Sequence, residues 1–482
     1  MSHQTSIFKG AILTVTLRWT DRLIGFVSTL ILARLLLPDD FGVVAMASMV
    51  ILLADVFLNL GVNVALIQNH NATQDHYNTA WTLRLSQTIL SCLIVSLFAP
   101  FAGQYFDDLR VVPVIQLISI HLVLNGMENI GVINFQKQML FAHDFRFRLS
   151  KRLFGFVVTI VAAYFLRNYW ALVIGTLAGS GLGVILSYLM HPMRPKFSFV
   201  KIKEIFSVSQ WMLVNSIGQY FNNNAHKILV GRTNSTSVMG GYSLSDEIAL
   251  MPTGELLSPI NRVLFPAFSA VKTNLIELKK MYLLAQGVQT LIAIPASVGL
   301  MLVAHEAVYV LLGENWLFAV PFLKILVLAN IFQAIITSGH YMIITLGYFR
   351  YAAMVTWFQV FIFIVLFITS NTSAAYEIAT IRILSILIGF SLLIWLVMRV
   401  LPDLKLYEII RTVIRPIIAS LIMFFVVTGL NDYLTFNLEI VLFLKIFIGA
   451  LVYFFSVLSF WILSGKPDGS EKYILKKVFL QK

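Results

Sequence analysis

Charged and amide side chains interrupt the long apolar stretches of this sequence, and they are its chemically informative residues. In the first stretch, Arg18 and Arg22 are four residues apart, with Asp21 beside them. Residues at this spacing share one face of a helix. Ionisable groups at membrane depth are unfavourable unless they face a partner or a water-filled cavity. Asp21 can neutralise only one of the two Arg, so the pattern favours a cavity, and a buried ion pair is the alternative.

The second and third apolar stretches carry further polar groups. Asp55, Asn59 and Asn63 follow one another at steps of four residues, which places a polar stripe along one helix face. The stripe predicts either a cavity wall or hydrogen bonds between helices, which Asn commonly makes in membranes. Arg84 lies near one end of the third stretch, where it could face a cavity or extend to lipid headgroups. Three further cations lie near the ends of apolar stretches, and we expect their side chains to contact lipid headgroups: Lys324, Arg382 and Lys445.

The seventh and eighth stretches hold the largest share of polar residues. The seventh carries five amides, a His and a Lys: Asn215, Gln219, Asn222, Asn223, Asn224, His226 and Lys227. A helix facing lipid could not carry so many amides, so we expect it to line water or protein. The eighth places four polar residues along one face: Glu247, Glu255, Ser258 and Arg262. Pro252 and Pro259 are able to bend this helix.

These residues predict a polar, net cationic cavity that suits an anionic, sugar-like cargo. Guanidinium groups match phosphate, and amides match hydroxyl groups. The sequence contains no Walker A loop, no HExxH motif, no glycine-rich nucleotide loop and no spacing typical of paired metal ligands. We therefore expect a transporter without cofactor or metal rather than an enzyme or an ATP-driven pump. Nucleic acid is not expected as a partner, because the basic residues are spread over one membrane face.

The composition indicates that these polar residues lie on membrane-spanning helices. Of the 482 residues, 59% are hydrophobic and only 12% are charged, which excludes one compact soluble core. The first stretch is too long for a cleavable signal, and the single Cys92 excludes an intramolecular disulfide. Windows of 18–25 residues predict an all-α polytopic membrane protein with about fourteen spans: 11–37, 41–67, 81–105, 111–133, 153–167, 169–189, 207–231, 238–268, 283–304, 321–345, 352–370, 375–398, 414–430 and 439–463.

The basic residues predict the orientation of these spans. The chain has 35 Lys and Arg against 23 Asp and Glu, and the cations gather in alternate loops. Because cytoplasmic loops are enriched in Lys and Arg, both termini are expected in the cytoplasm, with the chain in the cell inner membrane. The loops predicted outside are short.

An internal repeat at an offset of 198 residues organises the spans. Residues 31–34 align with residues 229–232 without a gap, and Gly42 aligns with Gly240. Six helices separate the two starts, which predicts a parallel repeat of two six-helix lobes. The predicted parts are an N-terminal lobe of residues 1–200, a C-terminal lobe of residues 201–400, and residues 401–482 with two more helices and a basic tail. Chance similarity of two apolar stretches is the alternative.

Several short stretches together carry a resemblance to a known family: residues 32–36, 38–42, 60–61, 65–68, 144–148, 170–172, 194–195, 228–232, 241–244, 261–268, 312–316 and 319–321. They resemble the polysaccharide transporter family, the Wzx-type lipid-linked oligosaccharide flippases of the MOP exporter superfamily. The resemblance implies a MATE-like fold, alternating access, and export of undecaprenyl-diphosphate-linked repeat units for surface polysaccharide, with polysaccharide polymerases and other assembly proteins as partners. The chain departs from the family at His226, where members commonly carry an acidic residue.

For a flippase we expect the cargo diphosphate to contact five cations: Arg18, Arg22, Arg84, Lys227 and Arg262. Asn222 and Asn223 would contact sugar. Coupling to an ion gradient would use a carboxylate: Asp21, Asp55, Glu247 or Glu255. Two alternatives stay open. An ion-coupled multidrug exporter of the same superfamily predicts a net acidic cavity, and a membrane polymerase or glycosyltransferase predicts a larger external loop.

Overall fold

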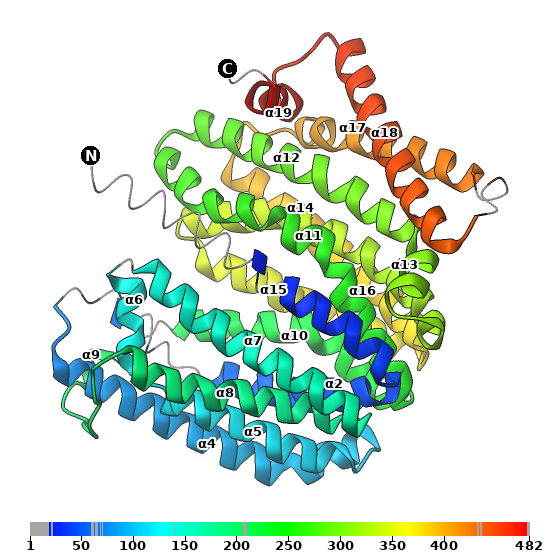
Figure 1. Ribbon diagram of the computed structural model, residues 1–482. Coiled ribbons are helices and arrows are strands. Elements are labelled where there is room, and N and C mark those ends of the chain that lie inside the picture. The colour runs from blue at the N-terminus through cyan, green and yellow to red at the C-terminus, as the bar shows by residue number, and fades with distance from the viewer. Residues whose placement is uncertain are drawn as a thin grey trace. The chain divides into compact units, whose positions relative to one another are not determined.

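The computed structural model describes residues 19–20, 23–58, 62, 66–67, 69, 71–138, 140–205, 210–430, 433 and 436–479. They divide into two compact units, each built of helices (Figure 1). Unit 1 comprises Met1–Tyr220 and Gly231–Gly240, and unit 2 comprises Phe221–Val230 and Gly241–Lys482. The helices α10 (Gln210–Thr233) and α11 (Thr236–Val271) therefore each contribute residues to both units. The predicted lobe boundaries at residues 200 and 400 stay a prediction.

Unit 1 is a bundle in which neighbouring helices pair along their lengths. Its elements are the helix Leu23–Leu35, α2 (Pro38–Leu58), α4 (Gln74–Phe106), α5 (Val111–Met127), η1 (Ile130–Val132), α6 (Ile133–Lys137), α7 (Phe141–Leu166), α8 (Trp170–Met190) and α9 (Ile202–Ile205). The helix α4 packs along α5, and α7 packs along α8 (Figure 1). The helix α5 also contacts α2 and α8, which makes it the centre of the unit.

Small residues let α7 and α8 approach closely. A Cβ atom on Gly175 would lie 2.7 Å from the Cβ of Thr159, and one on Gly155 would lie 3.4 Å from the Cα of Gly179. In a membrane, helices associate through such close backbone packing because lipid provides no hydrophobic driving force between them.

Unit 2 is a second helical bundle with a large apolar core. Its further elements are α11 (Thr236–Val271), α12 (Leu275–Leu302), α13 (Ala304–Leu311), η2 (Glu314–Ala319), α14 (Val320–Thr345), α15 (Phe349–Ser370), α16 (Ala375–Val400), α17 (Leu406–Gly429), α18 (Leu438–Leu463) and α19 (Ser470–Phe479). The helix α14 packs against α12 and α16, while α17 packs against α12 and α18. Phe268, Leu278, Met342 and Val397 are fully buried in the core cluster of this unit.

The all-α membrane fold predicted from the sequence is confirmed. Among the described residues, nine helices are long and apolar enough to cross a membrane. The segments Val111–Met127 and Ile130–Lys137, which meet at a bend of 68°, together make a tenth candidate. The helices α10 and α11 are also long, at 24 and 36 residues, but they carry the polar residues singled out above. The count of fourteen spans stays a prediction.

Three predicted details differ from the structure. The helix α7 begins at Phe141, twelve residues before the predicted start of the span at 153, so the cations just before that span, including Arg146 and Arg148, lie on the helix and not in a loop. Charges lower the hydropathy of a window without preventing a helix. The headgroup contacts expected for Arg382 and Lys445 are wrong, because Arg382 is buried in an ion pair with Asp246 and Lys445 in one with Glu306. Each cation has a carboxylate on a neighbouring helix and so has no need to reach the headgroups.

Candidate functional site

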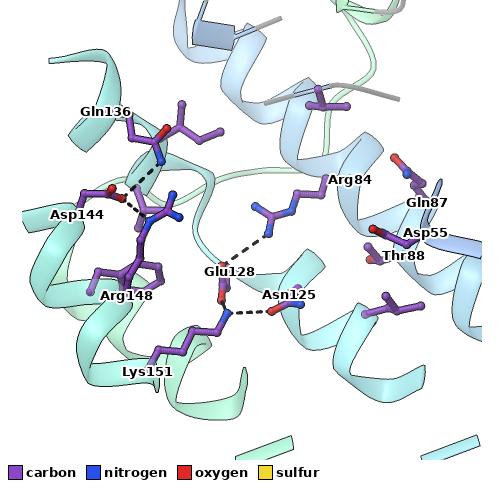
Figure 2. Close-up of a pocket in the computed structure, with 15 residues that line it drawn as sticks. Asp55, Arg84, Gln87, Thr88, Asn125, Glu128, Gln136, Asp144, Arg148 and Lys151 are labelled. Carbon is purple, nitrogen blue, oxygen red and sulfur yellow. Dashed lines mark hydrogen bonds and ion pairs between the residues drawn. The ribbon is translucent and has the colours of Figure 1, made fainter. Parts of the chain in front are cut away.

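A cavity of about 400 Å³ lies within unit 1, and α2, α4, α5 and α7 contribute to its wall (Figure 2). Ten polar residues line it: Asp55, Arg84, Gln87, Thr88, Asn125, Glu128, Gln136, Asp144, Arg148 and Lys151. Three of these are acidic and three are basic. The described lining therefore has balanced charge, unlike the net cationic cavity that the sequence predicts.

Two cations share one carboxylate at the centre of this cavity. Lys151 donates hydrogen bonds to Glu128 and, at 2.9 Å, to the Oδ1 atom of Asn125. The Nη2 atom of Arg84 lies 3.6 Å from the Oε2 atom of Glu128 (Figure 2). The Glu128 side chain is only 8% exposed, so its charge is compensated mainly by these two partners. We call Arg84, Glu128 and Lys151 the cavity triad, which carries one net positive charge.

A break between helices holds Glu128 in place. Glu128 is the C-cap of α5, immediately before the bend of 68°. The next residue, Asn129, fixes the bend by accepting a hydrogen bond from the Gly131 amide at 2.9 Å and donating one from its own amide to Ser187 Oγ at 2.9 Å. Its side-chain nitrogen also donates to the carbonyl of Met193 at 2.6 Å. The residues after the bend are thus tied to α8 and to the segment that follows it, which limits where Glu128 can move.

Hydrogen bonds link the triad to the interior of α8. Asn125 accepts from Lys151 through Oδ1, so its Nδ2 atom donates to Nε2 of His121, 2.9 Å away. An imidazole that accepts at Nε2 carries its proton at Nδ1 when neutral. That nitrogen lies 2.5 Å from Ser180 Oγ, which donates in turn to the carbonyl of Thr176 at 2.9 Å. This chain fixes the orientation of Asn125 and hence of the Lys151 ammonium.

A second ion pair stands beside the triad. Arg148 donates to Asp144 at 3.0 Å, one turn apart on α7, and its side chain is half exposed. Exposed pairs at this spacing contribute little to stability. Arg148 is therefore able to leave Asp144 for another anion at small cost, whereas the triad is more enclosed.

The structure brings together two of the predicted site residues in unit 1. Arg84 and Asp55 both line the cavity. Arg18, Asp21 and Arg22 lie outside the described residues. Sequence reasoning missed the other eight polar residues that line the cavity, including Asn125, Glu128 and Lys151. Glu128 could have been identified from the sequence, because it is an acidic residue inside the predicted span 111–133. Lys151 could not, because it lies just before the predicted span that starts at residue 153.

Unit 2 contains a buried ion cluster on three helices. Asp246 of α11 is 2% exposed and accepts from Lys227 of α10 at 2.9 Å and from Arg382 of α16 at 2.6 Å. We call these three residues the α11 ion cluster. Like the cavity triad, it pairs two cations with one carboxylate.

A buried imidazole lies beside the cluster. His226 is fully buried, with Nε2 3.0 Å from the carbonyl of Asn223 and Nδ1 2.8 Å from the hydroxyl of Tyr242. A carbonyl only accepts, so Nε2 carries a proton, and in the neutral imidazole Nδ1 accepts from Tyr242. The adjoining cavity, lined by Asn222, His226 and Arg382 among others, has a volume of about 10 Å³ and could hold no more than one water molecule. The cluster is therefore packed protein rather than space for a cargo.

The predicted residues of the second half lie at different depths. Asn222 and Lys227 lie at or beside the α11 ion cluster, and Asn223 and Glu247 are exposed. Glu255 and Arg262 are half-buried on α11. The buried acid of this helix is Asp246, which sequence reasoning missed. It shares a helix face with three buried residues, Ala249, Thr253 and Leu257. This helical spacing could have identified Asp246 as buried from the sequence.

Residues 31–321, more than half of the chain, match the family described as polysaccharide biosynthesis protein. A curated relative is the lipopolysaccharide biosynthesis protein WzxC of Escherichia coli (strain K12), 27% identical over 318 residues, which are 65% of this chain and 64% of the relative. The chain thus spans about 64% of the length of that relative.

Solved structures of the same fold include the lipid II flippase MurJ in an inward closed conformation, with a TM-score of 0.77 at 15% identity over 94% of this chain and 99% of that one. An inward-facing multidrug resistance MATE family transporter of the MOP superfamily has a TM-score of 0.55 at 15% identity, over 80% of this chain and 96% of that one. At these identities the likeness concerns the fold. The chain is a multi-pass membrane protein and belongs to the polysaccharide biosynthesis protein family.

Proposed function

We propose that this protein moves polyprenyl-diphosphate-linked oligosaccharides across the cell inner membrane, by alternating access, for assembly of a surface polysaccharide. Family membership supports a role in polysaccharide biosynthesis. The name of WzxC supports a lipopolysaccharide pathway, and the fold is that of a lipid II flippase, whose cargo is also lipid-linked.

The observation that carries the proposal is the cavity triad. Arg84 and Lys151 share the single carboxylate of Glu128, so an anion entering the cavity meets two cations of which one is uncompensated. A diphosphate carries charge enough to bind both, and guanidinium binds phosphate oxygens in bidentate fashion. When the diphosphate leaves, Glu128 pairs with both cations again. In the absence of cargo each cation therefore keeps a carboxylate contact, although the triad carries one net positive charge.

Neutral polar groups around the triad suit the sugar. Gln87, Thr88 and Gln136 line the same cavity and can donate to or accept from hydroxyl groups. A volume of about 400 Å³ is enough for the diphosphate and the first sugar. The polyprenyl tail would remain in lipid.

The sequence also predicts cargo-binding residues outside this cavity. We assign Arg18 and Arg22 to the diphosphate, together with Arg262, and the exposed Asn223 to sugar. Asn222, which the sequence also assigns to sugar, lines the cavity of about 10 Å³ beside the α11 ion cluster and has no room for a sugar there. Lys227 contributes less to binding of the diphosphate than the sequence suggested, because it is already paired with Asp246. Asp21, Asp55, Glu247 and Glu255 remain the candidates for coupling transport to an ion gradient.

A fusion experiment tests the proposed topology, in which both termini are cytoplasmic. A reporter that is active only in the periplasm should work when fused after Tyr433, between α17 and α18, and should be inactive when fused after Phe479. Activity at both positions would refute this arrangement.

Complementation of a deletion strain tests the function. The strain should lose surface polysaccharide and accumulate lipid-linked repeat units on the cytoplasmic face, and the wild-type gene should restore both. An ion-coupled drug exporter predicts a different result, in which polysaccharide is normal and sensitivity to cationic drugs increases. A polymerase predicts single repeat units on the outer face, so assaying intermediates on both faces separates the three activities.

A further inference from the structure

A second cavity lies in unit 2, where α19 packs against the first half of α12 (Figure 1). Its volume is about 1340 Å³, and its wall comes from α12, α17, α19 and the segment before α19. Five cations line it, namely Lys280, Arg411, Arg415, Lys472 and Lys476, together with three acids, namely Glu408, Asp468 and Glu471. The cavity triad belongs to unit 1, so these two cavities are separate.

Each acid of the second cavity already has a cationic partner. Glu408 pairs with Lys279 at 2.7 Å, and Glu471 pairs with Arg415 at 2.6 Å. Asp468 accepts from Lys472, and this hydrogen bond lowers the pKa of Asp468 below its ordinary value. The local carboxylates are therefore neutralised mainly by these partners, and the charge of Lys476 also contributes to the lower pKa of Asp468.

Three cations remain for a ligand: Lys280, Arg411 and Lys476. Within the part of the chain that the structure describes, none of them makes an ion pair or a hydrogen bond through its side chain. They come from three different helices and line the same cavity. Like charges held together in this way favour a bound anion.

The helix α19 is docked firmly enough to form a wall. Ser470 and Glu471, at its start, are both buried. A Cβ atom on Gly287 of α12 would lie 2.7 Å from Ser470 Oγ, so the glycine makes room for this residue. The Trp461 indole donates to the carbonyl of Pro467 at 3.2 Å and secures the turn that leads into α19.

Two of the three cations, Lys280 and Arg411, lie where the sequence predicts the edge of the bilayer. The apolar crossings of α12 and α17 begin near residues 283 and 414. Lys280 and Arg411 each lie about one turn before these points, which is headgroup depth. Tyr407 and Tyr473 line the same cavity and are partly exposed, as is usual for aromatic residues at a membrane interface.

We propose that this cavity binds the headgroup of an anionic glycerophospholipid. Its phosphodiester would contact Lys280, Arg411 and Lys476. Its acyl chains would lie on the exposed apolar side chains that follow Arg411 on α17, Ile414 and Ile418. Inorganic phosphate matches the charge but not this apolar flank. The general enrichment of Lys and Arg at the cytoplasmic face could account for three basic residues at this depth. It does not account for a cavity that has α19 as one of its walls.

Lipid titration of the purified full-length protein tests the proposal. Short-chain phosphatidylglycerol, added in a neutral detergent, should raise the melting temperature, whereas phosphatidylcholine and inorganic phosphate should leave it unchanged. The variant K280Q/R411Q/K476Q should bind phosphatidylglycerol about fivefold more weakly for each cation removed. The variant K203Q/K272Q/K466Q removes three exposed lysines outside the cavity, and it should respond to lipid like the wild type.

The outcomes separate this proposal from its rivals. An equal loss of lipid response in both triple variants would refute it, because the effect would then come from net charge alone. A response to inorganic phosphate would also refute it in favour of a free anion site. A response to polyprenyl diphosphate but not to phosphatidylglycerol would make the cavity part of the cargo path. Binding is measured without transport, so failure of the proposed flippase activity would leave this result unaffected.

Discussion

Gly240 approaches Gly42 so closely that a Cβ atom on Gly240 would lie 2.9 Å from the backbone nitrogen of Gly42. The approach is reciprocal, since a Cβ on Gly240 would lie 2.9 Å from the carbonyl carbon of Pro38, and a Cβ on Gly42 would lie 2.8 Å from that of Thr236, the residue aligned with Pro38. Gly42 and Gly240 are aligned positions of the 198-residue repeat. Reciprocal contacts between equivalent residues are typical of a two-fold relationship.

A hydrogen bond joins a further aligned pair. Ser237 donates from Oγ to Asp39 at 3.4 Å, and these residues are also 198 positions apart. The two helix starts therefore meet through equivalent residues. This pattern favours a true repeat over chance similarity, which the sparse sequence identities could not decide.

We expect Gly42→Ala and Gly240→Ala each to destabilise the protein. The added methyl group would clash with backbone atoms, which cannot move away by changing rotamer as a side chain can. Overpacking of this kind costs about 1–3 kcal/mol. Gly254 of α11 is a matched control, since a Cβ atom there meets nothing within 4 Å. Gly254→Ala should be neutral or stabilising. Thermal unfolding in detergent measures all three variants, and equal melting temperatures would show that the crossing tolerates a side chain.

The cavity triad predicts a loss of transport without a loss of folding. Arg84→Ala and Lys151→Ala should each abolish complementation of the deletion strain, because the diphosphate would lose one of its two cations. Both side chains are partly exposed in the cavity, and Glu128 retains one partner in each variant. Protein abundance in the membrane should therefore stay near the wild-type level.

Arg146 provides the matched control for this experiment. It lies on α7, is exposed, and does not line the cavity. Arg146→Ala should complement fully. If Arg84→Ala and Lys151→Ala complemented equally well, the triad would have no part in cargo binding. If both variants were absent from the membrane, its role would be structural.

The α11 ion cluster predicts the opposite behaviour. Asp246→Asn would leave Lys227 and Arg382 buried without their carboxylate. Breaking a buried ion pair by removing one partner costs about 3–5 kcal/mol. We expect little folded protein and a much lower melting temperature, whereas Glu247→Gln, one residue away and exposed, should melt like the wild type. Wild-type stability in Asp246→Asn would exclude a structural role for the cluster.

The fold was largely predictable because lipid imposes a simple rule. A chain that crosses the hydrocarbon must satisfy its backbone within helices, so long apolar stretches locate the helices. The rule fails where a helix extends beyond the lipid. The helix α7 begins in the polar segment around Arg146, where hydropathy is low but helix formation continues.

The candidate site was predictable only in part, because sequence does not say which polar residues face each other. Arg84 was recognised as a cavity candidate, but its partner Glu128 lies 44 positions along the chain, at a bend that hydropathy cannot detect. On α11 the sequence offered two adjacent acids, and Glu247 was chosen. The buried acid is Asp246, since burial depends on which helix face meets Arg382.

The final prediction concerns energy coupling, and Glu255 is our choice of coupling residue. It is half-buried on α11, between Pro252 and Pro259. Each proline removes a backbone hydrogen bond, so this part of the helix can bend more easily than its surroundings. A carboxylate here would be able to link its protonation to the shape of α11. Arg262, two turns further along, would be available to the cargo diphosphate when Glu255 is protonated and would be attracted back when it is ionised.

Glu255→Gln mimics the protonated state permanently. We expect this variant to bind lipid-linked cargo normally but to transport it at a rate that no longer depends on an imposed ion gradient. Transport of labelled cargo in proteoliposomes, with and without the gradient, measures this dependence. Glu247→Gln and Asp55→Asn are the comparisons, because each removes one of the other described candidate carboxylates. If Glu255→Gln still depended on the gradient and one of these variants did not, the coupling role would belong to the residue changed in that variant. If Glu255 has only a structural role, Glu255→Gln should be less stable while its transport still depends on the gradient.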